Sequence, residues 1–120
     1  PCSATGTIRR HPDVAYLKRA EDVSHAGQAQ LRLLNAAAAM VKPGGCIVFA
    51  TCSLQPEEGS DVIQTFLAEQ NNWQRLPIKA SEVGGQDEFI TAADDLRTLP
   101  CHLAEAGFMD GFFAARLVRA

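Results

Sequence analysis

A short apolar run constrains the fold of this chain more than any other feature. Residues 46–51 are a continuous stretch of small and apolar residues between Gly44-Gly45 and a polar turn. Such a run, bounded by turn signals, is typical of a strand covered on both faces, as in the parallel sheet of an α/β protein. We therefore expect a buried strand here, inside a layered fold of helices and strands.

The segments on either side of this strand carry helical signals. The first is predicted over residues 28–41, because four apolar residues recur at spacings of three and four: Leu31, Leu34, Ala38 and Val41. Pro43 and the two glycines after it end that helix. A second long helix is expected from Pro56 onward. Its predicted buried stripe is Val62, Ile63, Phe66 and Leu67.

The rest of the chain predicts short elements. We expect a brief helix over residues 13–19, and residues 21–27 are ambiguous. Strands are expected over residues 73–78, 96–99 and 112–118, with a polar, irregular segment over 80–95. The predicted order is helix, strand, helix, strand and further strands, which indicates an α/β class with an antiparallel finish.

Composition excludes several classes of protein. The 120 residues are 47% hydrophobic and 21% charged, which favours one globular domain over a disordered chain. The net charge of −3 argues against a domain that grips nucleic acid by bulk positive charge. No apolar stretch approaches the ~20 residues that cross a bilayer, and no signal peptide is recognisable. We therefore expect a cytoplasmic, monomeric protein, and a start at Pro1 suggests part of a longer one.

Two of the four cysteines stand in settings that suit chemistry. Cys52 follows the end of the apolar strand, and functional sites of open α/β sheets lie beyond the carboxyl ends of strands. Cys2 lies in a turn of small residues, where a ligand can approach the backbone closely. Taken singly, each is more often a small buried or incidental residue. No Cys-x-x-Cys pair is present, so a zinc site lacks support from spacing.

The two cysteines together belong to a longer pattern. It comprises Pro-Cys-Ser-x-x-Gly at residues 1–6, Pro-Gly-Gly at 43–45, Thr-Cys-Ser-x-x-Pro-Glu-Glu at 51–58 and Met-Asp-Gly-Phe-Phe at 109–113. In this order, and spanning nearly the whole chain, the pattern resembles the C-terminal part of the Sun/Fmu-type RNA cytosine-5 methyltransferases, the RsmB-like ribosomal RNA enzymes. A double-cysteine pattern of this length is specific, whereas any single piece is weak.

The resemblance implies a fold, a cofactor and a site. The fold would be the C-terminal half of a Rossmann-like methyltransferase domain that uses S-adenosylmethionine, with a mixed sheet and an antiparallel last strand. Cys52 maps to the nucleophile that adds to C6 of cytosine, and Cys2 maps to the cysteine that assists product release. The substrate would be RNA, with ribosomal RNA favoured over tRNA. No metal or membrane is expected.

The same resemblance implies that part of the machinery lies elsewhere. The family's cofactor loop is rich in glycine, and the nine glycines here include no Gly-x-Gly-x-Gly. We therefore interpret residues 1–120 as the C-terminal part of a catalytic domain, without the cofactor-binding half and the RNA-binding domain. The intact protein would be the enzyme, and this chain alone is expected to be inactive.

Other polar residues are weaker candidates. Arg9 and Arg10 lie beside the Cys2 loop and could hold RNA phosphates, although solvated arginines are the commoner case. Asp110 could lie near the site or simply form a turn. The remaining candidates are interpreted as structural or exposed: Glu57 and Glu58 as acids at a helix start, Cys46 as a packing residue, and Cys101, His11, His25 and His102 without a derived role.

Three other functions compete with the methyltransferase. A thiol redox or metal-binding module would need closely spaced ligands, which the sequence lacks. A non-catalytic interaction domain would be free to lose Cys2 or Cys52, and both are present. A DNA cytosine-5 methyltransferase also uses a Pro-Cys nucleophile, but the second cysteine in Thr51-Cys52-Ser53 favours the RNA class.

The resemblance also predicts how the strands pair. In this class of methyltransferase the last strand inserts between its two predecessors. Residues 112–118 are therefore expected to pair antiparallel with 47–50 on one side and with 73–78 on the other. Since loops that leave the carboxyl ends of neighbouring strands share one crevice, Cys2 and Cys52 should lie at the same end of the sheet.

Overall fold

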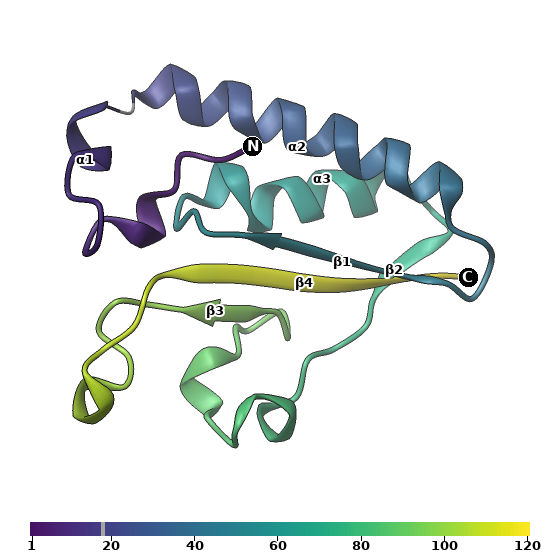
Figure 1. Cartoon of the computed structure of the whole chain (residues 1–120). Coiled ribbons are helices and arrows are strands. Elements are labelled where there is room, and N and C mark those ends of the chain that lie inside the picture. Colours follow the sequence, from purple (N-terminus) through teal and green to yellow (C-terminus); the bar gives the residue numbers. More distant parts are fainter. Residues whose placement is uncertain (18) are drawn as a thin grey trace.

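The computed structural model describes residues 1–17 and 19–120 and has two main layers, helices on one face of a four-stranded sheet (Figure 1). The helices are α1 (Val14–Leu17), α2 (Ala20–Met40) and α3 (Ser60–Glu69). The strands are β1 (Cys46–Thr51), β2 (Trp73–Arg75), β3 (Leu96–Thr98) and β4 (Phe112–Arg119). Five short 3₁₀ turns connect them: η1 (Thr5–Thr7), η2 (Pro56–Glu58), η3 (Ala80–Val83), η4 (Asp87–Phe89) and η5 (Ala104–Ala106).

Strand β4 occupies the centre of the sheet, as predicted. It pairs antiparallel with β1 along one edge, where Ile47 lies opposite Leu117. Along its other edge it pairs antiparallel with β2, where Arg75 lies opposite Leu117, and then with β3, where Leu96 lies opposite Ala114. The α/β class with an antiparallel last strand is therefore confirmed.

Strand β2 is shorter than the expected residues 73–78. It ends at Arg75, although the Leu76 backbone N–H still donates to the Arg116 carbonyl at 2.9 Å. Pro77 follows and has no N–H to continue the ladder, so the strand stops there. The irregular segment and the short strand after it are confirmed, as η3, η4 and β3.

The core lies between the helices and the inner face of the sheet. Phe66 of α3 packs edge-on against Trp73 with ring centroids 5.7 Å apart. The predicted stripe of α3 is confirmed, with Leu67 partly buried at its border. The buried core residues are Leu34, Ala38, Val62, Ile63, Phe66, Trp73, Phe113, Ala115 and Leu117.

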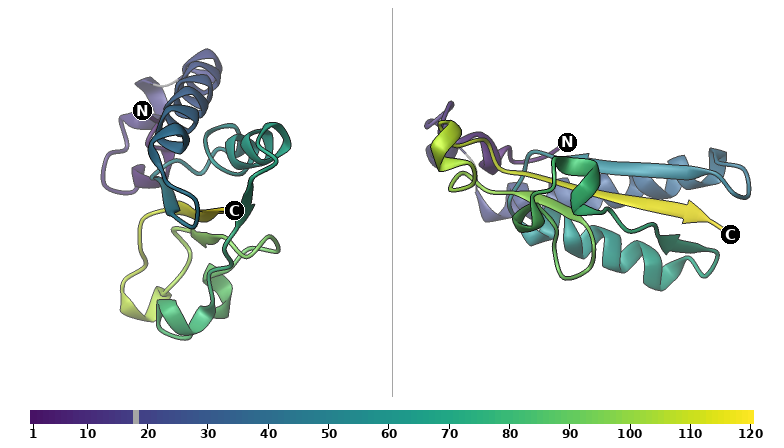
Figure 2. Two further views of the ribbon diagram at one scale, coloured as in Figure 1. Left: turned by 90° about the vertical axis from the view of Figure 1, so that its right-hand side faces the viewer. Right: turned by 90° about the horizontal axis from the view of Figure 1, so that it is seen from below.

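The expectation that β1 is buried on both faces is wrong for this chain. Ile47 and Phe49 point toward the helices, but Cys46, Val48 and Ala50 on the opposite face are exposed, Val48 at 64%. The reason is that α2 and α3 both lie on the same side of the sheet, as the two further views in Figure 2 also show. The packing role expected for Cys46 is therefore wrong as well.

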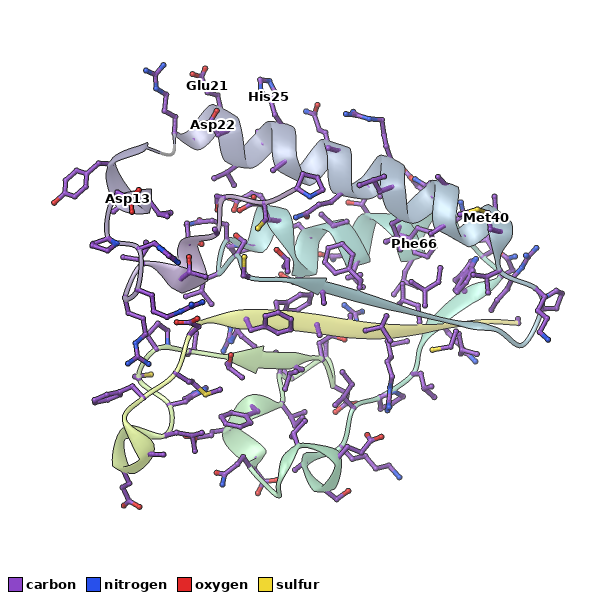
Figure 3. The ribbon with its side chains drawn as sticks, in the orientation of Figure 1. Asp13, Glu21, Asp22, His25, Met40 and Phe66 are labelled. Atoms are coloured by element: carbon purple, nitrogen blue, oxygen red, sulfur yellow. The ribbon has the colours of Figure 1, made fainter. Side chains whose placement is uncertain are left out.

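The helices also differ from their predicted bounds. Helix α2 begins at Ala20, so the ambiguous residues 21–27 are helical. The Asp22 carboxylate accepts a hydrogen bond from the Arg19 backbone N–H at 2.9 Å and stabilises this start. Figure 3 shows Glu21 and His25 on the outer face of α2, away from the sheet. The short helix expected over 13–19 is α1, and Lys18 lies outside the described residues.

Helix α3 begins later than predicted. Residues 56–58 form the separate turn η2, and the helix proper begins at Ser60 after Gly59. Among the described residues, no helix combines the length and apolar character that a membrane span requires.

Phe66→Ala tests the assignment of the core. Removing a fully buried ring that contacts Trp73 should lower the free energy of unfolding by roughly 3–5 kcal/mol. The control is Met40, which is 81% exposed at the end of α2. Met40→Ala should change the free energy of unfolding by less than about 0.5 kcal/mol. Urea denaturation followed by tryptophan fluorescence measures both. Equal effects of the two substitutions would contradict this core.

Candidate active site

Three loops meet where β1 ends and β4 begins. They are residues 1–6, the residues after Thr51, and residues 109–111 (Figure 1). The Gly6 backbone N–H donates to the Cys52 carbonyl at 2.8 Å, and the Gly111 N–H donates to the Gly6 carbonyl at 2.7 Å. Backbone hydrogen bonds thus join segments from the two ends of the chain and its middle into one site.

Gly6 is the residue that allows this close approach. It is buried, and a Cβ at this position would overlap the carbonyl oxygens of both Gly111 and Cys52. These are backbone atoms within the loops that the site joins, so they cannot move aside as a flexible side chain would. A glycine is therefore required sterically, which explains the glycine in the Pro-Cys-Ser-x-x-Gly motif.

The meeting of the loops brings two thiols into contact. The Cys2 and Cys52 sulfurs lie 3.2 Å apart and share one hydrogen bond, and both residues are partly buried. This distance exceeds the ~2.05 Å of a disulfide, and both cysteines are free. The prediction that both lie at the same end of the sheet is confirmed, whereas their catalytic roles stay predictions.

The environment shifts the pKa values of the two thiols in opposite directions. Burial, together with the hydrogen bond and the charge of Cys2, raises the pKa of Cys52 to about 11. Burial also opposes ionisation of Cys2, but hydrogen bonds from Cys52, the Thr51 hydroxyl and the Ala4 backbone N–H outweigh it, so the pKa of Cys2 is lowered. Of the two thiols, Cys2 therefore ionises at the lower pH.

A buried carboxylate lies beneath the thiol pair. Glu58 is fully buried and accepts hydrogen bonds from the Ser3 backbone N–H at 2.5 Å, from the Ser3 hydroxyl at 2.5 Å and from the Ser53 hydroxyl. The interpretation of Glu58 as an acid at a helix start is wrong, because η2 is a separate turn and the side chain points inward. The serine that follows each cysteine was the sequence signal for this arrangement.

The basic residues beside the loops are engaged in contacts of their own. Arg10 forms an ion pair with Asp110, with Nε at 2.6 Å from Oδ2, and its guanidinium lowers the pKa of Asp110. Arg9 donates to the Gly107 carbonyl at 2.9 Å. Both arginines are exposed, and these contacts tie the 1–13 segment to the loop before β4. Their proposed contact with RNA phosphates stays a prediction.

The remaining sequence candidates lie apart from the thiols. His102 is buried, packs against Phe89 in a tilted arrangement with ring centroids 5.3 Å apart, and accepts a hydrogen bond from the Leu99 N–H at Nδ1. His11, His25, Glu57 and Cys101 are exposed. Within residues 1–17 and 19–120, no group of three or more His, Cys, Asp or Glu side chains could hold a metal ion.

A cleft that was not predicted lies beside the Cys52 loop. Its volume is about 460 Å³, and its lining includes residues 53–56 and 90–93. Asp95, which also lines the cleft, is buried and pairs with Arg75, whose Nε lies 3.2 Å from both carboxylate oxygens. The long separation of these segments in the sequence left no local signal for it.

Comparison with known proteins identifies the family. A model of the RsmB/F 16S rRNA methyltransferases matches residues 1–118. The chain belongs to this family. The resemblance seen in the sequence motifs is thereby confirmed.

Its relatives share both sequence and fold. The chain is 45% identical over 120 residues to the ribosomal RNA small subunit methyltransferase B of Salmonella paratyphi B, and the match covers 99% of this chain and 24% of that protein. The crystal structure of PH0851 superposes with a TM-score of 0.84 at 30% identity, over 99% of this chain and 25% of that one. The structure of a methyltransferase homologue from Pyrococcus horikoshii superposes with a TM-score of 0.70 at 29% identity, and the match covers 100% of this chain and 37% of that one. The chain thus spans about a quarter of the curated relatives.

The residues present do not form a site for S-adenosylmethionine. The described residues around the thiol pair offer hydroxyls, thiols and the buried Glu58, whereas a nucleoside cofactor in Rossmann-type folds is held by a glycine-rich loop and an acid on a following strand. No Gly-x-Gly-x-Gly occurs in the sequence. The part of the chain that the structure describes therefore holds the two thiols without the groups that are typical of a nucleoside cofactor site.

Gly6→Ala tests the junction of the three loops. The added methyl overlaps two backbone carbonyls, so the free energy of unfolding should fall by more than about 2 kcal/mol and the thiols should separate. Ala4 in the same loop has a left-handed backbone with φ 58°, which glycine adopts freely, so Ala4→Gly should stay within about 1 kcal/mol of wild type. Urea denaturation of both variants measures the contrast. A harmless Gly6→Ala would refute the steric argument.

Proposed function

We propose that the intact protein transfers a methyl group from S-adenosylmethionine to C5 of a cytosine in ribosomal RNA, through a covalent cysteine adduct at C6. The observation that carries this proposal is the 3.2 Å contact between the Cys2 and Cys52 sulfurs, in a chain of the RsmB/F family. Two thiols in contact suit a reaction in which one forms the adduct and the other assists its breakdown.

This chain contributes the C-terminal part of the catalytic domain to that activity. It covers a quarter of its curated relatives, and the outer edge of β1 is unpaired among the described strands. A groove of about 250 Å³ runs beside this edge, with Pro1, Leu33 and Val48 in its lining. An additional strand next to β1 would fill the groove and cover these apolar side chains. The cofactor pocket and the RNA-binding domain belong to the rest of the protein.

The thiol chemistry follows from the electron demand of the target. Cytosine C5 is a poor nucleophile, and addition of a thiolate to C6 breaks the 5,6 double bond and places electron density on C5. In this proposal Cys52 is that nucleophile. Cys52 is partly exposed, and its proton passes to water before the sulfur attacks C6 as a thiolate. S-adenosylmethionine, when bound, supplies the methyl cation equivalent to C5.

Release of the product needs a second group near the adduct. A base removes the C5 proton, and β-elimination then restores the 5,6 double bond and expels the Cys52 thiolate. Cys2 lies in contact with Cys52 and is the residue proposed to assist this elimination.

The geometry also bears on the form of the RNA. A base paired in a helix cannot reach two half-buried sulfurs, so the target cytosine must be unstacked, as in a loop or a single strand. Arg9 and Arg10 flank the Cys2 loop on the surface and are proposed to contact phosphates near this base. We expect the protein to act as a cytoplasmic monomer.

Substitution of the two cysteines in the intact enzyme should give opposite results. Cys52→Ala should abolish methylation and leave no covalent complex, because nothing adds to C6. Cys2→Ala should permit addition and methyl transfer but stall release, so that protein stays attached to RNA. Denaturing gel electrophoresis with labelled ribosomal RNA measures both.

The controls for this experiment separate the alternatives. Cys101→Ser, at an exposed position, should behave as wild type. If the Cys52 variant instead stays covalently attached to RNA, the two proposed roles are reversed. Trapping of tRNA but not ribosomal RNA would change the substrate, and activity without either thiol would leave only a non-catalytic interaction domain for this part of the fold.

The isolated chain should not bind S-adenosylmethionine measurably. The glycine-rich loop and acids that hold this cofactor are missing from the sequence, so no pocket of high affinity is available. Isothermal titration calorimetry of the 120-residue chain measures this, with the intact protein as the positive control. A micromolar dissociation constant for the chain alone would show that residues 1–120 hold a cofactor site of their own.

A further inference from the structure

Each cysteine of the thiol pair is followed by a serine, and the two Cys-Ser dipeptides lie side by side. The sulfurs of Cys2 and Cys52 are 3.2 Å apart, and the hydroxyl oxygens of Ser3 and Ser53 are 3.3 Å apart. The cysteines are partly exposed, whereas both serines are almost fully buried. The dipeptides therefore connect the same two loops through two side-chain contacts, an outer rung formed by the thiols and an inner rung formed by the hydroxyls.

Glu58 joins the inner rung to both loops. Its Oε1 accepts the Ser3 backbone N–H at 2.5 Å, and its Oε2 accepts the hydroxyls of Ser3 at 2.5 Å and of Ser53. Ser3 and Glu58 are far apart in the sequence, whereas Ser53 and Glu58 belong to the same loop and turn. One carboxylate thus fixes the first loop onto the second, directly below the thiols.

This burial is unfavourable without a compensating role. Glu58 is fully buried, and among the described residues it forms no ion pair with a basic side chain. An unpaired charge in the interior costs several kcal/mol unless hydrogen bonds satisfy it, and here three charge-assisted bonds do so. An apolar residue of similar volume would avoid this cost but would leave the two hydroxyls and the Ser3 N–H without a partner.

We propose that Glu58 is the positioning residue of the thiol pair: by binding Ser3 and Ser53 it holds the Cys2 and Cys52 sulfurs in contact. This role deepens the proposed function, on which its catalytic meaning rests, but the contact itself can be measured without RNA or cofactor. Glu58 touches neither substrate nor sulfur and acts through the two serines.

The charge of Glu58 gives a second readout. A carboxylate near a thiol disfavours the thiolate, and Glu58 acts to raise the pKa of both Cys2 and Cys52. The other charged groups facing the pair are Arg10, which interacts favourably with a Cys52 thiolate, and Asp110, which Arg10 neutralises. Loss of the Glu58 charge alone should therefore shift thiol ionisation to lower pH.

The experiment uses the intact protein with Cys46, Cys101 and any cysteine outside residues 1–120 replaced by serine, so that Cys2 and Cys52 report alone. The first readout is disulfide closure by diamide, whose azo bond accepts the two electrons and two protons that the thiols release. The second is the pH dependence of alkylation by iodoacetamide, resolved for each cysteine by peptide mass spectrometry. Urea denaturation reports whether each variant is folded.

Glu58→Gln separates charge from geometry. The glutamine can keep all three contacts if the two serine hydroxyls accept hydrogen bonds from its NH₂ group, so closure should stay within about twofold of wild type. The alkylation profile should shift to lower pH, because a negative charge is gone. Glu57→Gln in the same turn is the matched control, since Glu57 is exposed, and it should change neither readout.

Glu58→Ala removes the connection itself. Disulfide closure should slow by at least about tenfold, because the three bonds of Glu58 are lost, while those of Gly6 and Thr5 still join the two loops. Closure at the wild-type rate in a folded Glu58→Ala protein would overturn the proposal. If that variant is unfolded, Ser3→Ala decides: it removes the hydroxyl bond from the first loop to Glu58, and closure at the wild-type rate in that variant would overturn the proposal. Normal thiol contact in a protein that methylates no RNA would instead refute the proposed function and leave this inference intact.

Discussion

The rest of the structure depends on one constraint, which is that β1, β2 and β3 all pair with β4. Strand β1 uses one edge of β4, and β2 and β3 share the other. The same strand supplies Phe113, Ala115 and Leu117 to the core beneath the helices. Its first residue follows Gly111, whose N–H binds Gly6, so the strand that orders the sheet also delivers one of the three loops of the site.

The site at the end of this strand is built from short polar groups rather than from exposed charge. Two thiols and two hydroxyls lie in pairs above a buried carboxylate, and the nearby Arg10 is compensated by Asp110. That carboxylate disfavours a thiolate on either sulfur, whereas hydrogen bonds from Cys52, Thr51 and Ala4 lower the pKa of Cys2. Geometry and electrostatics together make Cys2 the thiol of the pair that ionises more readily.

Much of this arrangement could be predicted from the sequence, since its signals are local or belong to a long motif. The apolar run of β4 and the stripe of α3 follow from spacing, and the meeting of Cys2 with Cys52 follows from the family pattern. The exposed face of β1 could not be predicted, because an apolar pattern states that a surface needs cover but not which segment provides it. Glu58 was misinterpreted for a related reason. Pro-Glu-Glu is locally typical of a helix start, whereas Ser3, the hydrogen-bond partner of Glu58, lies near the start of the chain. Contacts between distant segments leave no periodic signal.

The position of β4 in the sequence sets an order for folding. Its partners β1, β2 and β3 all precede it, and Cys46 pairs with Val118 across most of the chain. A ribosome emits roughly 5–20 residues per second, so α2, β1 and α3 emerge seconds before the strand that joins them. Helical contacts within and between α2 and α3 can form during that interval, whereas the sheet cannot. The junction of the three loops is therefore complete only after residues 111–119 have been synthesised, because the Gly111 N–H closes it on the Gly6 carbonyl.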